Sequence, residues 1–178
     1  MDLGGVQRPE SGSGPLFHRV YSTRIRDADI SAGELIGRVA ADPNEVAPRS
    51  FTSFQKERGD DGDMQPGNEF LVRMPGPWDG PIRCIERTPT SFRFATLDGH
   101  LEAGQIEWRA RDGAETVQFQ IESWARPGDR LSNVLHHRLR MAKEVQLHMW
   151  ISVLERVVKL SGGRMTGGVA IHTRVADY

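Results

Sequence analysis

The sequence predicts an α+β fold in which an antiparallel sheet of about seven strands is covered by one long C-terminal helix. Three observations support this fold. Short alternating segments between residues 51 and 124 are separated by Gly, Pro and Asp, as in an antiparallel meander. A helical pattern follows from about residue 131 to residue 160, and Gly162 and Gly163 end it. Residues 96–104, TLDGHLEAG, form a turn that we expect to join two central strands.

The composition is that of a single globular domain. The chain has 178 residues, of which 38% are hydrophobic and 26% are charged. Its formal net charge of -1 gives no long-range attraction to polyanions, so we expect no nucleic-acid partner. No apolar stretch approaches the length of a membrane span, so we expect no membrane insertion and, by default, a cytoplasmic location. The single cysteine, Cys84, excludes an intrachain disulfide and is expected to be a buried hydrophobe.

The N-terminal part divides into a tail, a strand and a short helix. Residues 1–15 are rich in Gly and Pro and are expected to form a flexible tail outside the fold. The first strand is predicted at 16–25, where Phe17, Tyr21 and Ile25 share one face. A helix is predicted between residues 30 and 39, with Asp29 or Ser31 as its N-cap. The folded domain is expected to span residues 16–163.

Six further strands are predicted in the meander, at residues 51–57, 69–74, 82–86, 91–96, 105–110 and 116–124. The last two have the clearest alternation. In the first of these, Ile106, Trp108 and Ala110 alternate with polar residues, so one face of the strand is expected to be buried and the other exposed to solvent. The sequence Asp112-Gly113 fits the tight turn between the two strands.

The long helix carries two apolar surfaces. A broad face that includes Val145 and Met149 is expected to cover the sheet. A second stripe lies nearly opposite and consists of Leu147, Ile151, Leu154 and Val158. One sheet cannot bury both surfaces. We therefore expect the second stripe to be covered by the C-terminal tail, residues 164–178, or by a second copy in a homodimer.

A family resemblance rests on the TLDGHLEAG segment. Its residues Thr96, Gly99, His100, Glu102 and Gly104 meet a Thr-x-x-Gly-His-x-Glu-x-Gly pattern. With GPW at 76–78 and SWARP at 123–127, this pattern resembles a bacterial and plant domain-of-unknown-function family of the START and birch-pollen-allergen (SRPBCC) superfamily. The resemblance covers about residues 30–160. It implies a helix-grip fold, in which a strongly curved sheet wraps around the last helix, and a cavity that often holds an apolar ligand.

His100 and Glu102 are the candidate catalytic pair. Two residues apart in an extended segment, they can point the same way, and a carboxylate beside an imidazole can raise its pKa for proton transfer. Alternatively, both side chains bond to the backbone and fix the turn. A metal site needs a third ligand, and the other histidines lie in no metal-binding spacing, so neither a metal nor another cofactor is expected.

The wall of the implied cavity is expected to come from inward-facing residues of the sheet and the helix. These residues are Phe70, Val72, Phe94, Thr96, Trp108, Phe119, Ile121, Val145 and Met149. The alternative is that they pack against one another as ordinary core. Three functions follow from these patterns: a binding protein for a small hydrophobic molecule, a hydrolase or cyclase-like enzyme using His100 and Glu102, and an interaction module.

Overall fold

The computed structural model describes residues 5–74, 79–128 and 136–176, without the side chains of 136–145. One antiparallel sheet has the strand order β2-β3-β4-β5-β6-β7-β1-β8. Its strands are β1 (Leu16–Arg26), β2 (Ser53–Arg58), β3 (Glu69–Arg73), β4 (Gly80–Thr88), β5 (Ser91–Thr96), β6 (Glu102–Asp112), β7 (Thr116–Pro127) and β8 (Arg164–Ala176). The helices are α1 (Ala32–Ala41) and α3 (His136–Leu160), with short 3-10 turns at Pro9–Ser11 and Pro43–Glu45.

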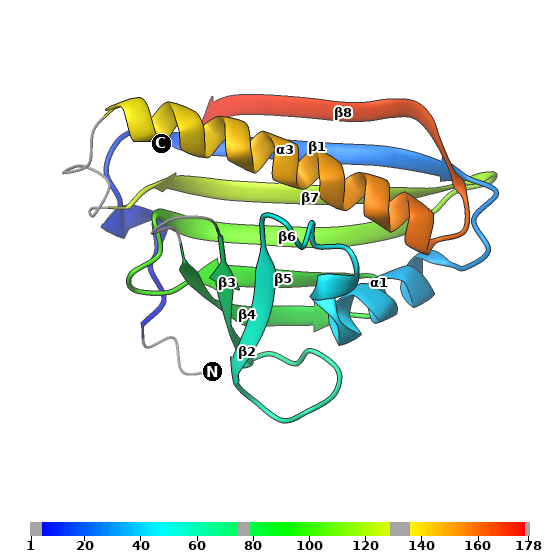
Figure 1. The fold of residues 1–178 in the computed structure, drawn as a ribbon, viewed down its shortest axis with the longest axis horizontal. Helices are drawn as coiled ribbons and strands as arrows, with labels where there is room; N and C mark the ends of the chain where they lie inside the picture. Colours follow the sequence, from blue (N-terminus) through cyan, green and yellow to red (C-terminus); the bar gives the residue numbers. More distant parts are fainter. Residues whose placement is uncertain (1–4, 75–78, 129–135, 177–178) are drawn as a thin grey trace.

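Both helices lie on the same face of the sheet, α3 across β1 and β7 and α1 at one end of the strands (Figure 1). The predicted α+β fold, a sheet covered by a long C-terminal helix, is confirmed. The 96–104 turn joins β5 and β6, which are the two middle strands of the sheet. Within the described residues, no helix is long and apolar enough to cross a membrane; the cytoplasmic location stays a prediction.

The alternation in β6 and β7 produces the buried face of the sheet. Trp108 lies opposite Ile121 and Ala110 opposite Phe119, and all four side chains are buried. Their polar neighbours lie on the other face, as the period of two requires. Cys84, on β4, is buried as expected, and burial raises the pKa of its thiol to about 11.

Helix α1 is fixed at its N-terminus by a capping box. The Ser31 side chain accepts the backbone N–H of Glu34, and the Glu34 carboxylate accepts the N–H of Ser31. Asp112 Oδ1 accepts the N–H of Ala32 at 2.9 Å. Ser31 is therefore the N-cap, and the β6–β7 hairpin holds the start of the helix.

The C-terminal segment, expected to cover the helix or to meet a partner, is a strand of the sheet that also contacts α3. Residues 164–176 form β8, which pairs with β1 from Leu16 opposite Ala176 to Arg26 opposite Arg164. The sheet thus has eight strands rather than about seven. The physical reason is that β1 would otherwise expose a full row of unpaired backbone groups at the sheet edge.

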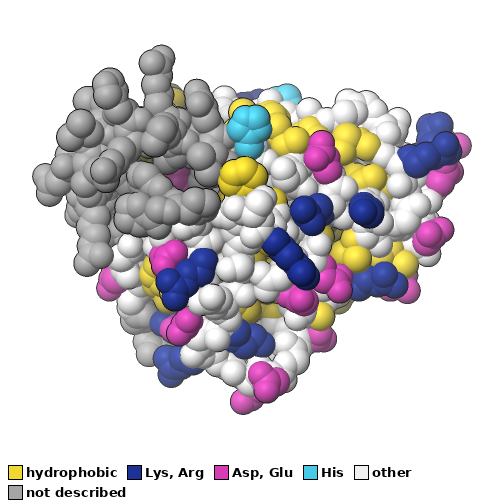
Figure 2. All heavy atoms as spheres, viewed as in Figure 1, with side chains coloured by type: hydrophobic (Ala, Val, Ile, Leu, Met, Phe, Trp, Pro, Cys, Tyr) yellow, Lys and Arg dark blue, Asp and Glu magenta, His cyan; other side chains and the backbone are white. Residues whose placement is uncertain are grey.

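The second apolar stripe of α3 lies largely inside its own chain. Leu154 is fully buried and Val158 is 8% exposed, while Met165 and Val169 of β8 pack against the same core. A homodimer contact was predicted through Leu147, Ile151, Leu154 and Val158. Two of these side chains, Leu154 and Val158, are buried within the chain and are not available to a partner. Strand β8 extends the sheet past β1. The sheet can therefore contact both apolar surfaces of α3. On the described part of the helix face, apolar side chains are interspersed with charged ones (Figure 2).

The N-terminal segment also differs from the flexible tail that was expected. Val6 pairs with Leu97 and Gly12 with Gly128. The backbone N–H of Gln7 donates to the carbonyl of Thr96 at 2.8 Å. Residues 5–15 therefore close the end of the sheet where the 96–104 turn lies. A Gly- and Pro-rich composition does not reveal such pairing, because it reports the apolar content of a segment and not its backbone hydrogen bonds.

We predict that Leu154→Ala lowers the free energy of unfolding by about 2–5 kcal/mol, because it leaves a cavity in the core between α3 and the sheet. The matched control is Val175→Ala on β8, where the side chain is 56% exposed and the loss is below about 0.5 kcal/mol. Urea denaturation measures both values. Equal, small losses in the two variants would contradict the burial of the second stripe.

Candidate ligand-binding cavity

The 96–104 turn is held by a hydrogen bond between its two ends. Thr96 Oγ1 accepts the N–H of Gly104 at 3.0 Å and lies 3.2 Å from the Gly104 carbonyl. A Cβ on Gly104 would lie 2.0 Å from the carbonyl oxygen of Trp124, so no other residue fits there. Gly99 has φ 99°, a left-handed conformation that favours glycine. Three residues of the family pattern thus build the turn.

His100 is clamped between the turn and β4. Its Nδ1 lies 3.0 Å from both the backbone nitrogen and the carbonyl oxygen of Glu102, so the Glu102 backbone holds the ring. The opposite ring edge lies against Gly80, where an added Cβ would be 2.5 Å from Nε2. Burial lowers the pKa of His100 below its ordinary value, although the Glu102 carboxylate acts in the other direction. The carboxylate thus acts in the expected direction, but burial has the larger effect, and the net pKa of His100 is lowered.

The Glu102 carboxylate is bonded to two other elements. Arg19 Nη1 lies 3.4 Å from Oε1, and Gln146 Nε2 donates to Oε2 at 3.0 Å. Arg19 is buried on the inner face of β1, with its guanidinium 4.8 Å from the centre of the Phe17 ring. These contacts join β1, β6 and α3. The Glu102 carboxylate therefore binds Arg19 and Gln146, and the His100 ring binds the Glu102 backbone. The two side chains of the predicted pair do not bond to each other through the carboxylate.

A cavity of about 100 Å³, here called the helix–sheet cavity, lies between the sheet and α3. His100 and Glu102 both line it. Of the predicted wall residues, five line it as well: Val72, Phe94, Thr96, Trp108 and Met149. Phe70, Phe119 and Ile121 are buried in the core instead. The side chain of Val145 lies outside the described residues. Strand alternation identifies an inward side chain but not whether that side chain meets a void or a neighbour.

Sequence reasoning missed several residues of this site. The additional lining residues include Thr52, Phe54, Met74, Ile82, Gln146 and Trp150. Arg19, which holds Glu102, was also missed. A signal for it existed, since Arg19 lies at even spacing from Phe17 and Tyr21 and so shares their inward face. A charged residue on a dry face needs a buried partner.

Two polar atoms in the cavity wall have no hydrogen-bond partner among the described residues. They are Nε1 of Trp108 and Oγ1 of Thr52. Trp108 is 1% exposed and Thr52 is 4% exposed. Buried polar groups in folded proteins are nearly always paired, with protein or with a bound molecule. Neither atom exposes surface to the void, however, so both are unpaired groups within the packing behind the wall.

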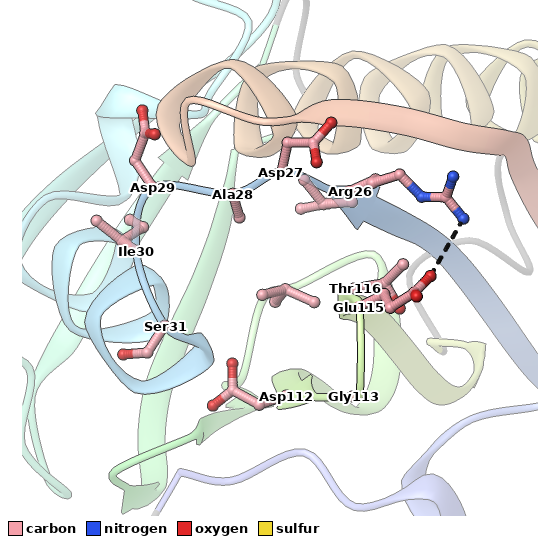
Figure 3. A pocket seen from close by; sticks show the side chains of 12 residues that line it. Arg26, Asp27, Ala28, Asp29, Ile30, Ser31, Asp112, Gly113, Glu115 and Thr116 are labelled. Carbon is pink, nitrogen blue, oxygen red and sulfur yellow. Dashed lines mark ion pairs between the residues drawn. The ribbon is translucent and has the colours of Figure 1, made fainter.

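A larger hollow of about 640 Å³ lies at the end of β1 beside the β6–β7 hairpin, and it is open to solvent (Figure 3). Two of its charged groups already have partners: Arg26 pairs with Glu115 at 3.7 Å, and Asp112 caps α1. Asp29 points away from Asp112 (Figure 3) and lies beside Gly162 at the end of α3. Within the described ranges, no group of three or more acidic, His or Cys side chains is placed to hold a metal. The smaller helix–sheet cavity is the better candidate site.

Comparisons with known proteins agree with this fold. Residues 53–158 match the family described as Domain of unknown function (DUF1990), and no curated protein matches the chain in sequence. The major latex-like protein 151 of Panax ginseng superposes with TM-score 0.60 at 12% identity, over 83% of this chain and 99% of that one. Ara h 8.0201 superposes with TM-score 0.51 at 10% identity, over 79% and 99%.

The di-domain ARO/CYC StfQ from the steffimycin biosynthetic pathway superposes with TM-score 0.60 at 10% identity. The match covers 83% of this chain and 51% of that two-domain chain. At such low identity these structures show the fold alone. They confirm the helix-grip fold that the family resemblance implied.

We predict that stability falls as the pH is lowered from about 7.5 to about 5.5, and that His100→Asn reduces this loss. Burial lowers the pKa of His100 in the folded state. As the pH falls, the unfolded chain therefore binds a proton at His100 before the folded chain does. The folded state loses stability as the pH falls below the pKa that His100 has in the unfolded chain. Urea denaturation at the two pH values measures the effect. The control is His148→Asn, since His148 is exposed on α3. An unchanged pH dependence in His100→Asn would contradict the prediction.

Proposed function

Because the chain belongs to the family described as Domain of unknown function (DUF1990) and has a helix-grip fold, we propose that it binds a small, largely apolar molecule in the helix–sheet cavity. The observation that carries this proposal is the composition of the cavity wall. Aromatic and aliphatic side chains make up most of it, and a few polar groups converge at one end. Such a combination is typical of small-molecule sites.

The size of the cavity limits the ligand. About 100 Å³ is below the roughly 300–1,000 Å³ of sites for drug-sized molecules, and below the roughly 150 Å³ of a cavity that accepts benzene. The resting cavity therefore suits a molecule no larger than a small ring. Met74 and Met149 line the wall, and their flexible side chains offer a way to admit a larger ligand.

The enzyme alternative is supported by the position of His100 and Glu102 at the cavity. Their bonds favour binding over catalysis, however, because the carboxylate is held by Arg19 and Gln146 and the imidazole by the Glu102 backbone. The Nε2 edge of the His100 ring is packed against Gly80, which favours a positioning role over proton abstraction. The interaction-module alternative is weakened by the burial of Leu154 and Val158.

We predict that small alicyclic and aromatic compounds raise the melting temperature of the wild type in a thermal-shift screen, because they bind only the folded state. Ser123→Leu should abolish this stabilisation, since it places a larger apolar side chain in the cavity wall. The control is Thr173→Leu at an exposed position of β8, which should respond like the wild type. If no compound stabilises the wild type, or if Ser123→Leu responds equally, the proposal fails.

A further inference from the structure

Two polar side chains from different elements meet in the wall of the helix–sheet cavity. Gln146 Nε2, on α3, donates to Glu102 Oε2, on β6, at 3.0 Å, and both residues line the cavity. Both side chains keep surface that the rest of the chain does not cover, since the Glu102 side chain is 28% exposed and Gln146 is half-buried. This carboxylate–amide pair is therefore accessible to a molecule in the cavity.

The carboxylate–amide pair has hydrogen-bonding capacity left over. A carboxylate offers about four lone-pair sites, and a glutamine amide offers two N–H donors and an acceptor oxygen. In the part of the chain that the structure describes, the Glu102 carboxylate accepts from Arg19 Nη1 at 3.4 Å and from Gln146. The Gln146 amide makes only the latter bond there. One N–H of Gln146 and further lone pairs of Glu102 thus remain, on groups that lie side by side.

A hydroxyl group matches both remaining capacities. It donates one hydrogen bond and accepts others through the same oxygen atom. Its proton can bind a lone pair of Glu102 in a charge-assisted hydrogen bond, and its oxygen can accept the second N–H of Gln146. A carbonyl oxygen, by contrast, can use only the Gln146 donor, and a hydrocarbon can use neither group.

The charges beside the pair favour a neutral ligand. Of the described lining residues, Glu102 carries the charge near neutral pH, because burial lowers the pKa of His100. An anionic ligand would meet the carboxylate without a cation in the described lining. Arg19 already compensates Glu102 from outside the lining, so a cationic ligand would lose its hydration in a largely apolar cavity without a free counter-charge.

We propose that the ligand is a compact neutral alcohol whose hydroxyl donates to the Glu102 carboxylate and accepts from the Gln146 amide. This inference rests on the proposed binding function and adds the chemical class of the ligand. Met149 follows Gln146 by three residues on α3, so the two side chains are neighbours on the helix surface, and both line the cavity. The hydrocarbon part of the alcohol packs against Met149 while the hydroxyl stays at the carboxylate–amide pair.

The test compares cyclopentanol with cyclopentanone, which share a ring and an oxygen atom and differ in the O–H donor. Titrations of ¹⁵N-labelled protein follow the side-chain amide resonances of Gln146, assigned by their loss in Gln146→Met. Both compounds should move these resonances, and cyclopentanol should bind about three- to tenfold more tightly, because it alone donates to Glu102. The internal control is the side-chain amide of Gln118, which is exposed on β7 outside the cavity lining and should not move.

Two variants separate the two hydrogen bonds. Glu102→Gln should remove the preference for cyclopentanol, because a neutral amide accepts more weakly than a carboxylate and can also donate to the ketone. Gln146→Met should weaken the binding of both compounds about threefold and keep the preference, because it removes only the shared N–H donor. The matched control is Gln118→Met, which should bind both compounds like the wild type.

A double variant protects the test against a loss of folding. Glu102→Gln leaves the buried Arg19 without its counter-charge, which destabilises the folded state. Arg19→Met combined with Glu102→Gln removes both charges, so no unpaired charge stays buried. The double variant should also bind the two compounds equally.

The possible outcomes separate this inference from the proposed function. Equal binding of cyclopentanol and cyclopentanone to the wild type would overturn the alcohol ligand and leave the binding function intact. A preference that persists in Glu102→Gln and in the double variant would show that another group accepts the hydroxyl proton. If other compounds of the thermal-shift screen bind and cyclopentanol does not, the ligand class is wrong. Failure of every compound, by contrast, would remove the proposed function itself.

Discussion

The close approach of β6 to β7 at Gly104 is the contact on which the site depends. A Cβ there would lie 2.0 Å from the Trp124 carbonyl oxygen, and the Gly104 N–H is bonded to Thr96 Oγ1. Together these contacts fix where β6 leaves the turn. Glu102, two residues earlier, then reaches Arg19 and Gln146, and its backbone N–H holds the His100 ring. The close contact at Gly104 thus helps to position Glu102 and His100, the polar residues beside the turn.

The position of α3 explains why a cavity exists beside it. The helix lies over β1 and β7 and contacts β8, so its packing is concentrated on one half of the sheet (Figure 1). Val72, Ile82 and Phe94 of the other half face the cavity. Only side chains can fill the gap between that half and the helix. The aromatic rings around Trp108 fill most of it, and about 100 Å³ remains.

The sequence predicted the parts of this structure that depend on local patterns. Alternation placed Trp108 and Phe94 on the inner face because the period of a strand is fixed by its own backbone. It did not predict the pairing of β8 with β1, because that pairing depends on the free edge of a strand more than a hundred residues away. Nor did it predict the lowered pKa of His100, because sequence shows the neighbouring carboxylate but not the burial that outweighs it. Thr52 and Gln146 were missed for the same reason, since a void forms where distant side chains fail to meet.

The polar residues of the cavity divide by whether their hydrogen bonds are already made. Thr96, His100 and Glu102 bond within the turn and to Arg19 and Gln146, so the residues of the family pattern mainly shape the site. The side chains that make up most of the wall, such as Phe54, Val72 and Met149, are apolar, and none of them belongs to that pattern. The residues that shape the turn and the residues that form most of the cavity wall are therefore different ones. It follows that the apolar wall can be changed, for example at Met149, while the turn and its hydrogen bonds stay intact.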